Sequence, residues 1–114
     1  SAAWCPVCAR KMPALGVMDM NTRPRGVLTV LALFESPNQQ PATPRDAAIW
    51  RRDRGLDFPV VADAEPVLRP YFTPFGRDKF MLIDAQTMEI VHLSPRFTAN
   101  ILETEINTWL AANP

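Results

Sequence analysis

One apolar segment constrains the fold of this chain more than any other feature. The run Gly26-Val27-Leu28-Thr29-Val30-Leu31-Ala32-Leu33-Phe34 contains a single polar side chain. It is much shorter than the ~20 apolar residues that a membrane-spanning helix needs. Because apolar side chains fall at successive positions, the run predicts a strand over 27–34 that is buried on both faces of a parallel sheet. Such a sheet needs helices on its faces, so we expect an α/β fold.

The rest of the chain contains the helices and strands that this sheet requires. The expected elements are a helix over 6–20, the strand over 27–34, a helix over 44–54, a strand over 58–62, a short helix over 65–71, strands over 80–84 and 89–93, and a helix from 98 onward. Thr43, Pro44 and Asp46 are typical of a helix start, and Gly55 is typical of a helix end. Pro13 predicts a kink or an early end of the first helix. The four-residue connection over 85–88 predicts an antiparallel hairpin.

The first and last helices each carry apolar side chains that can share one face. We expect these faces to pack into the core, with Val7, Met12, Leu15 and Met18 in the first helix and Ile101, Leu102, Ile106, Trp109 and Leu110 in the last. Phe97, which precedes the expected cap Thr98, is predicted to form a hydrophobic staple with Leu102.

Length and charge fit one folded domain over residues 1–114. Hydrophobic residues make up 47% of the chain and charged residues 21%, which excludes an intrinsically disordered class. Twelve Lys and Arg balance twelve Asp and Glu. This balance gives no support for a nucleic-acid partner or for contact with an anionic membrane.

The segment Trp4-Cys5-Pro6-Val7-Cys8 carries the strongest functional signal. A thiolate is the species that attacks a disulfide, and a helix N-terminus stabilises a thiolate through its free N–H groups and its dipole. Cys5 is placed at such an N-terminus, and Cys8 lies one turn further along. Cys5 can therefore form a mixed disulfide that Cys8 resolves. Pro6 shapes the turn, and Trp4 is expected to cover the sulfur atoms.

Other uses of two cysteines fit the spacing less well. A loop closed over so few residues constrains the unfolded chain little, so the pair is a poor structural staple. Two cysteines supply only half of a four-ligand zinc site. Covalent haem attachment is disfavoured because Ala9, rather than His, follows Cys8.

The segment Ala3-Trp4-Cys5-Pro6-Val7-Cys8 resembles the Trp-Cys-x-x-Cys site of the thioredoxin superfamily. Phe58-Pro59-Val60-Val61-Ala62-Asp63 and Met81-Leu82-Ile83-Asp84 resemble two strands of its TlpA-like branch. The resemblance implies a single thioredoxin-like domain, a three-layer sandwich around a central mixed sheet. It also implies a thiol–disulfide oxidoreductase that acts on protein thiols or disulfides, depends on an upstream redox partner, works as a monomer, and resides outside the bacterial cytoplasm. No cofactor is expected, because the cysteine pair itself carries the electrons.

The sequence departs from this family at three places. Family members have a central strand that leads directly into the motif, so we expect about ten further apolar residues before Ser1. The position of the family's cis-proline aligns with Asp78, and Pro74 lies four residues earlier. We therefore expect both residues to shape the site. Without a proline at position 78, we expect a weaker or more selective oxidoreductase than a typical thioredoxin. Members of the branch that act in cytochrome c maturation often carry an acidic residue three positions after the second Cys. Lys11 occupies that position here, which weakens any assignment to cytochrome c maturation.

Two other functions remain open. A copper-binding protein of the same fold would use Cys5, Cys8 and His92, although such proteins usually separate their cysteines by three residues. A redox-inactive interaction domain is the second alternative. Arg10, Lys11 and Glu35 are each expected to be solvated charges, the last at the end of the long strand. The alternative for Arg10 and Lys11 is that their positive charge lowers the pKa of the Cys5 thiol.

Overall fold

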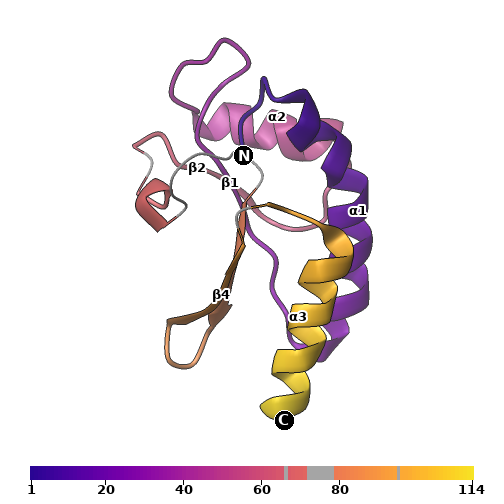
Figure 1. Ribbon diagram of the computed structural model, residues 1–114. Coiled ribbons are helices and arrows are strands. Elements are labelled where there is room, and N and C mark those ends of the chain that lie inside the picture. The colour runs from indigo at the N-terminus through magenta and orange to yellow at the C-terminus, as the bar shows by residue number, and fades with distance from the viewer. Residues whose placement is uncertain (66, 72–78, 95) are drawn as a thin grey trace.

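Within residues 1–65, 67–71, 79–94 and 96–114, which the computed structural model describes, four short strands form two separate sheets (Figure 1). β1 (Leu31–Leu33) pairs in parallel with β2 (Val60–Ala62). β3 (Phe80–Asp84) pairs antiparallel with β4 (Glu89–Ser94), which confirms the predicted hairpin. The α/β class is therefore confirmed, but the strands that the sequence predicts in one mixed sheet form a parallel pair and an antiparallel pair.

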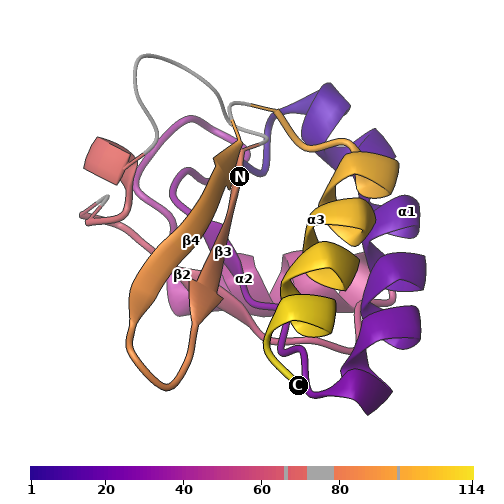
Figure 2. The ribbon, with the colours of Figure 1, turned by 60° about the horizontal axis from the view of Figure 1, so that its bottom comes forward.

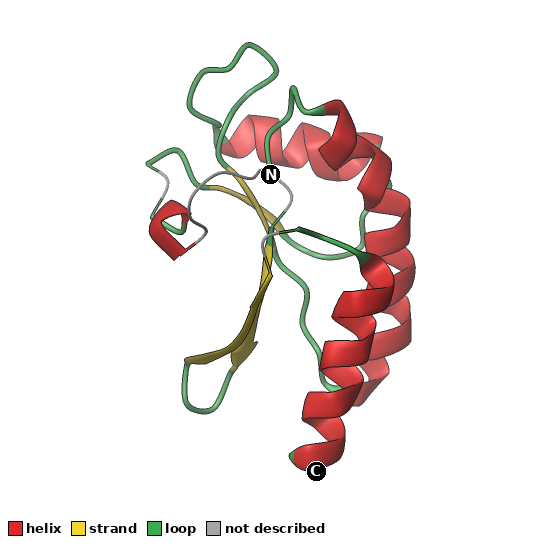
Figure 3. Cartoon of the chain, in the orientation of Figure 1, coloured by secondary structure: helices red, strands yellow, loops and turns green. Residues whose placement is uncertain are grey.

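Three α-helices within the same described ranges accompany these sheets (Figure 3). They are α1 (Pro6–Thr22), α2 (Pro44–Asp53) and α3 (Ala99–Ala112), and two 3₁₀ turns follow α1 and β2, η1 (Arg23–Arg25) and η2 (Arg69–Tyr71). The short helix predicted over 65–71 is thus reduced to η2, and residue 66 lies outside the described residues. None of the described helices is long and apolar enough to cross a membrane.

α1 runs past Pro13 and ends at Thr22, so the predicted early end is wrong. A proline removes one N–H from the helix ladder, and the cost is offset here by packing on the opposite face. Met12, Leu15 and Met18 are buried, as predicted. Val7 is 43% exposed and does not belong to this face.

α2 begins as the sequence predicts. The Asp46 carboxylate accepts hydrogen bonds from the Thr43 N–H and hydroxyl, each at 2.8 Å, and the Asp46 N–H donates to the Thr43 Oγ1 at 3.2 Å. This reciprocal capping box satisfies N–H groups that the first helical turn leaves without intrahelical partners. The helix ends before Gly55, whose φ of 60° is one that glycine adopts at little cost.

α3 lies beside α1, and the two helices run in the same direction (Figure 2). Leu102 and Ile106 are buried in the core, as is Phe97 just before the helix. Trp109 and Leu110 are half-buried. Ile101 is 52% exposed, so its predicted place on the buried face is wrong.

Two polar contacts join these two helices near their ends. The Lys11 ammonium donates a hydrogen bond to the Phe97 carbonyl oxygen at 2.9 Å, and the Arg25 guanidinium donates to the Asn107 side-chain oxygen. The first contact holds the start of α3 next to the turn of α1 that follows the cysteines. The second contact joins η1, the turn that follows α1, to the side of α3.

β1 is shorter than the predicted strand over 27–34. Only Leu31–Leu33 pair with β2, and Leu28 and Val30 are more than half exposed. A strand is buried on both faces and paired along its length only where neighbouring elements cover it. The described residues place no element of that kind beside 27–30.

The first three residues of the chain pair with the other edge of β1. The Phe34 N–H donates to the Ser1 carbonyl oxygen at 3.0 Å, and the Ser1 ammonium donates to the Ala32 carbonyl oxygen at 2.7 Å. Ala2 forms a parallel bridge with Glu35. Ser1 and Ala2 therefore lie alongside the end of β1, and a turn over Ala3 and Trp4, in which the Cys5 N–H donates to the Ala2 carbonyl oxygen at 3.2 Å, leads into α1.

A groove of about 380 Å³ separates β1 from the hairpin. Its lining is mostly apolar and comes from α1, residues 27–32, β3 and α3, including Met12, Leu28, Val30, Phe80, Leu82 and Ile106. The groove occupies the space between the two sheets.

The capping box predicts a pH-dependent contribution of Asp46 to stability. Hydrogen bonds from Thr43 lower the pKa of the Asp46 carboxyl below its ordinary value of 3.8. Because this pKa is lowered in the folded state, the carboxylate contributes its full stabilisation at pH values above the ordinary pKa. The stabilisation is lost as the pH falls through the pKa of the folded state. Asp46→Asn should therefore lower the melting temperature at neutral pH, and the difference from the parent should shrink in strong acid.

The Thr43→Ala background serves as the control for this measurement. The Thr43 hydroxyl is gone there, but the backbone N–H of residue 43, the larger cause of the lowered pKa, still donates to Asp46, so Asp46→Asn should change the melting temperature only somewhat less than it does in the parent. A difference between parent and Asp46→Asn that stays constant from neutral to strongly acidic pH would contradict the assignment.

Candidate functional site: a disulfide at a helix start

Cys5 is the N-cap residue of α1. Its backbone is extended, with φ −86° and ψ 108°, and Pro6 follows as the first helical residue. The Cys8 N–H donates a hydrogen bond to the Cys5 sulfur at 3.2 Å. This donor is one of the N–H groups that a helix start leaves without an intrahelical partner, so the sulfur takes the position of an N-cap side-chain oxygen.

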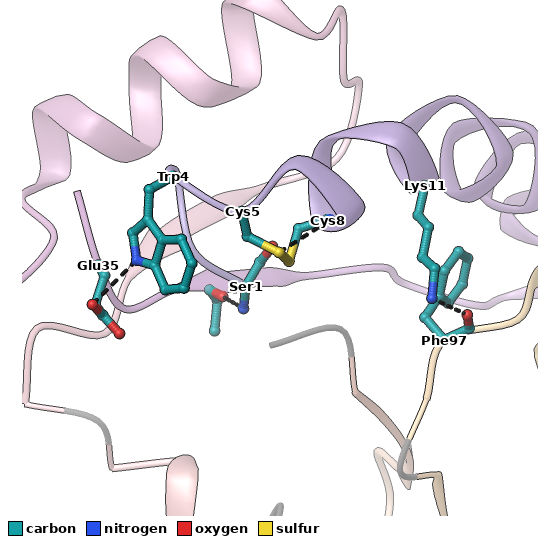
Figure 4. Close-up of a disulfide and its surroundings, with 8 residues drawn as sticks. Ser1, Trp4, Cys5, Cys8, Lys11, Glu35 and Phe97 are labelled. Atoms are coloured by element: carbon teal, nitrogen blue, oxygen red, sulfur yellow. Dashed lines mark hydrogen bonds between the residues drawn. A yellow bond between two sulfur atoms is a disulfide. The ribbon is translucent and has the colours of Figure 1, made fainter. Parts of the chain in front are cut away.

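Cys5 and Cys8 form a disulfide, with their Cα atoms 5.3 Å apart (Figure 4). This separation is within the range that a disulfide accommodates. Both residues are buried, but unequally: 8% of Cys5 is exposed and 1% of Cys8. Cys5 is therefore slightly the more exposed of two buried residues, and Cys8 lines the groove between β1 and the hairpin.

Trp4 and Glu35 form a contact on one side of the disulfide (Figure 4). The Trp4 indole N–H donates to the Glu35 carboxylate at 3.2 Å, and the indole packs against the hydrophobic core. The expectation that Glu35 is simply a solvated acid is wrong, because the carboxylate is half-buried and engaged with the motif. Only its position at the end of β1, the strand beside the motif, could have indicated this role.

Two basic residues follow the cysteines and have different environments. Arg10 is exposed, as expected for a solvated helix position. Lys11 is half-buried and contacts the Phe97 carbonyl oxygen on the other side of the disulfide from Trp4 (Figure 4). Lys11 therefore helps to attach α3 behind the site rather than projecting fully into solvent.

The structure gives no support to a copper site. The His92 ring stacks on Phe80 with centroids 5.7 Å apart, and its Nδ1 lies 3.5 Å from the Glu105 carboxylate. Across the residues whose positions are described, no group of three or more His, Cys, Asp or Glu side chains could hold a metal ion. The other two site-shaping candidates, Pro74 and Asp78, lie outside the described residues.

Comparison with known proteins adds no assignment, because no protein-family model matches this sequence and a search of curated proteins finds no match. The chemistry of the site must therefore be argued from its geometry. That geometry is a buried disulfide at a helix start, with its more accessible sulfur accepting a backbone N–H.

The unequal burial and capping of the two sulfur atoms predict unequal reactivity after reduction. Helix-start interactions of about 1–2 kcal/mol correspond to roughly fivefold to thirtyfold in rate. Iodoacetamide should therefore alkylate Cys5 faster than Cys8 by about that factor, as measured by peptide mass spectrometry at short reaction times.

Denatured reduced protein provides the control for this experiment, since both thiols should react there at similar rates. Faster labelling of Cys8 in the folded protein would reverse the assignment of the two roles.

Proposed function

We propose that this protein is a thiol–disulfide oxidoreductase that exchanges a dithiol and a disulfide with protein substrates through Cys5 and Cys8. The observation that carries the proposal is the hydrogen bond from the Cys8 N–H to the Cys5 sulfur at the start of α1. In the reduced protein the same donor, together with the positive end of the helix dipole, favours the Cys5 thiolate. The thiolate is the form that attacks a disulfide.

The exchange balances without a cofactor. The Cys5 thiolate attacks one sulfur of a substrate disulfide, the substrate S–S bond breaks, and its second sulfur leaves as a thiolate. The Cys8 thiolate, formed by loss of its proton to solvent, then attacks the Cys5 sulfur of the mixed disulfide and releases the other substrate thiolate. The substrate gains two electrons, the protein becomes the Cys5–Cys8 disulfide, and an external dithiol restores the reduced form by the reverse steps.

The surroundings of Cys5 favour a protein as the substrate. Val7 and Pro6 are exposed next to Cys5, and Trp4 presents part of its indole on the other side. An apolar rim around a nearly buried sulfur can seat an extended segment that carries a disulfide, since aromatic and apolar groups dominate protein contact surfaces. The site-shaping roles proposed for Trp4 and Pro6 follow from these positions.

The proposal includes the setting that the thioredoxin and TlpA-like resemblance implies. Disulfides form and persist outside the reducing bacterial cytoplasm. A disulfide enzyme there needs a partner that supplies or removes electrons. We therefore propose an extracytoplasmic bacterial protein that works with an upstream redox partner.

Reduction of insulin by dithiothreitol tests the proposed activity. The parent protein should accelerate the turbidity that follows cleavage of the insulin disulfides. With Cys5→Ser, turbidity should develop at the uncatalysed rate, because this variant lacks the attacking sulfur. Cys8→Ser, reduced and then freed of dithiothreitol before insulin is added, should instead accumulate a mixed disulfide with insulin, because the resolving sulfur is gone.

The two serine variants are matched controls for each other, since each removes one sulfur and prevents the internal disulfide. No acceleration by the folded parent protein would contradict the proposal and favour the redox-inactive interaction domain. A mixed disulfide that forms equally through Cys8 would contradict the assigned roles.

A further inference from the structure

We propose that Glu35 is a positioning residue, which holds the Trp4 indole beside the Cys5–Cys8 pair and thereby shapes the surface that meets a protein substrate. This inference rests on the proposed oxidoreductase function. It assigns a role in substrate engagement to a residue outside the motif, 27 positions after Cys8 in the sequence.

The backbone of Glu35 is fixed from two sides. Its carbonyl oxygen accepts a hydrogen bond from the Ala3 N–H at 2.9 Å, and Ala2 forms a parallel bridge with it. On its other side Glu35 forms an antiparallel bridge with Pro41. The carboxylate therefore projects from a backbone whose place relative to the motif is already determined.

The loop that follows Glu35 is itself tightly closed. The Ser36 N–H donates to the Gln40 carbonyl oxygen at 2.7 Å, and the Ser36 hydroxyl oxygen accepts from the Asn38 and Gln40 N–H groups at 3.3 and 3.2 Å. Ser36 is buried. This loop returns the chain to Pro41 and prevents the end of β1 from moving away from the motif.

The side-chain contact connects this fixed point to the active pair. An indole N–H is a donor only, and a carboxylate is a strong acceptor for it. The 3.2 Å contact between Trp4 and Glu35 selects one orientation of a ring that is bonded, through one peptide unit, to the attacking cysteine. With the ring held, its exposed part is a ready surface for a substrate segment, and less conformational freedom is lost on binding.

Two measurements test this role, and the first does not depend on catalysis. The fluorescence spectrum of Trp4 is obtained by subtracting the spectrum of Trp4→Phe from that of each protein, in the oxidised and reduced states. Glu35→Ala should change both the intensity of this difference spectrum and its response to reduction. Glu35→Gln keeps an acceptor oxygen and should restore most of the parent signal.

The second measurement compares a protein substrate with a small one. Glu35→Ala should raise the KM for insulin about tenfold with a small change in kcat, as expected for the loss of a well-ordered binding surface. The rate with oxidised glutathione should change little. Glu89→Ala, which removes an exposed acid at the start of β4, serves as the matched control and should leave both rates at the parent values.

An unchanged Trp4 difference spectrum in Glu35→Ala would overturn the proposal, whatever the exchange rates are. An equal loss of rate with insulin and with glutathione would also overturn it, because a general structural defect would then explain the result. If the parent catalyses no exchange, the proposed function fails, and the spectra still decide whether Glu35 orients Trp4.

Discussion

The pairing of residues 1–3 with the end of β1 is the constraint on which the candidate site depends. The backbone hydrogen bonds of this segment alternate between its two edges: those of Leu31 and Leu33 join it to the β2 side, while the Ala32 carbonyl oxygen and the Phe34 N–H bond to Ser1. These bonds fix the position of the residues before the motif along the strand. The chain then turns through Ala3 and Trp4 to Cys5, the N-cap of α1, and the Cys8 N–H donates to the Cys5 sulfur.

The chemistry of the disulfide follows from this placement. Both cysteines belong to the buried core, Cys5 being slightly the more exposed residue, and the two sulfur atoms differ in hydrogen bonding because the Cys8 N–H donates to the Cys5 sulfur. Glu35, two residues beyond Leu33, the last residue of β1, is brought next to Trp4 by its bridge with Ala2. The end of one strand thus positions both the start of α1, which carries the disulfide, and the Trp4 indole beside it.

Local signals in the sequence were sufficient for most helices and for the motif. The capping box of α2 and the hairpin turn involve residues close together in the chain, and both were predicted. The extent of β1 was not, because a strand is paired only where a neighbour is present, and residues 27–30 border the groove instead. The contact of Glu35 with Trp4 spans 31 residues, so no local pattern could reveal it. Pro13 is the opposite case: of the two outcomes that it predicted, a kink or an early end, the early end is wrong, because α1 continues to Thr22 with its other face buried in the core.

The central claim is that the Cys5–Cys8 disulfide is exchanged rather than structural, and its reduction potential tests this most directly. Equilibration with mixtures of reduced and oxidised glutathione, followed by trapping of free thiols, gives the fraction of protein in each state. We expect one reversible two-electron transition with a midpoint between about −270 and −120 mV, the range that thiol–disulfide enzymes span. A disulfide that stays oxidised throughout the series, with a potential below about −300 mV, would be structural and would contradict the account.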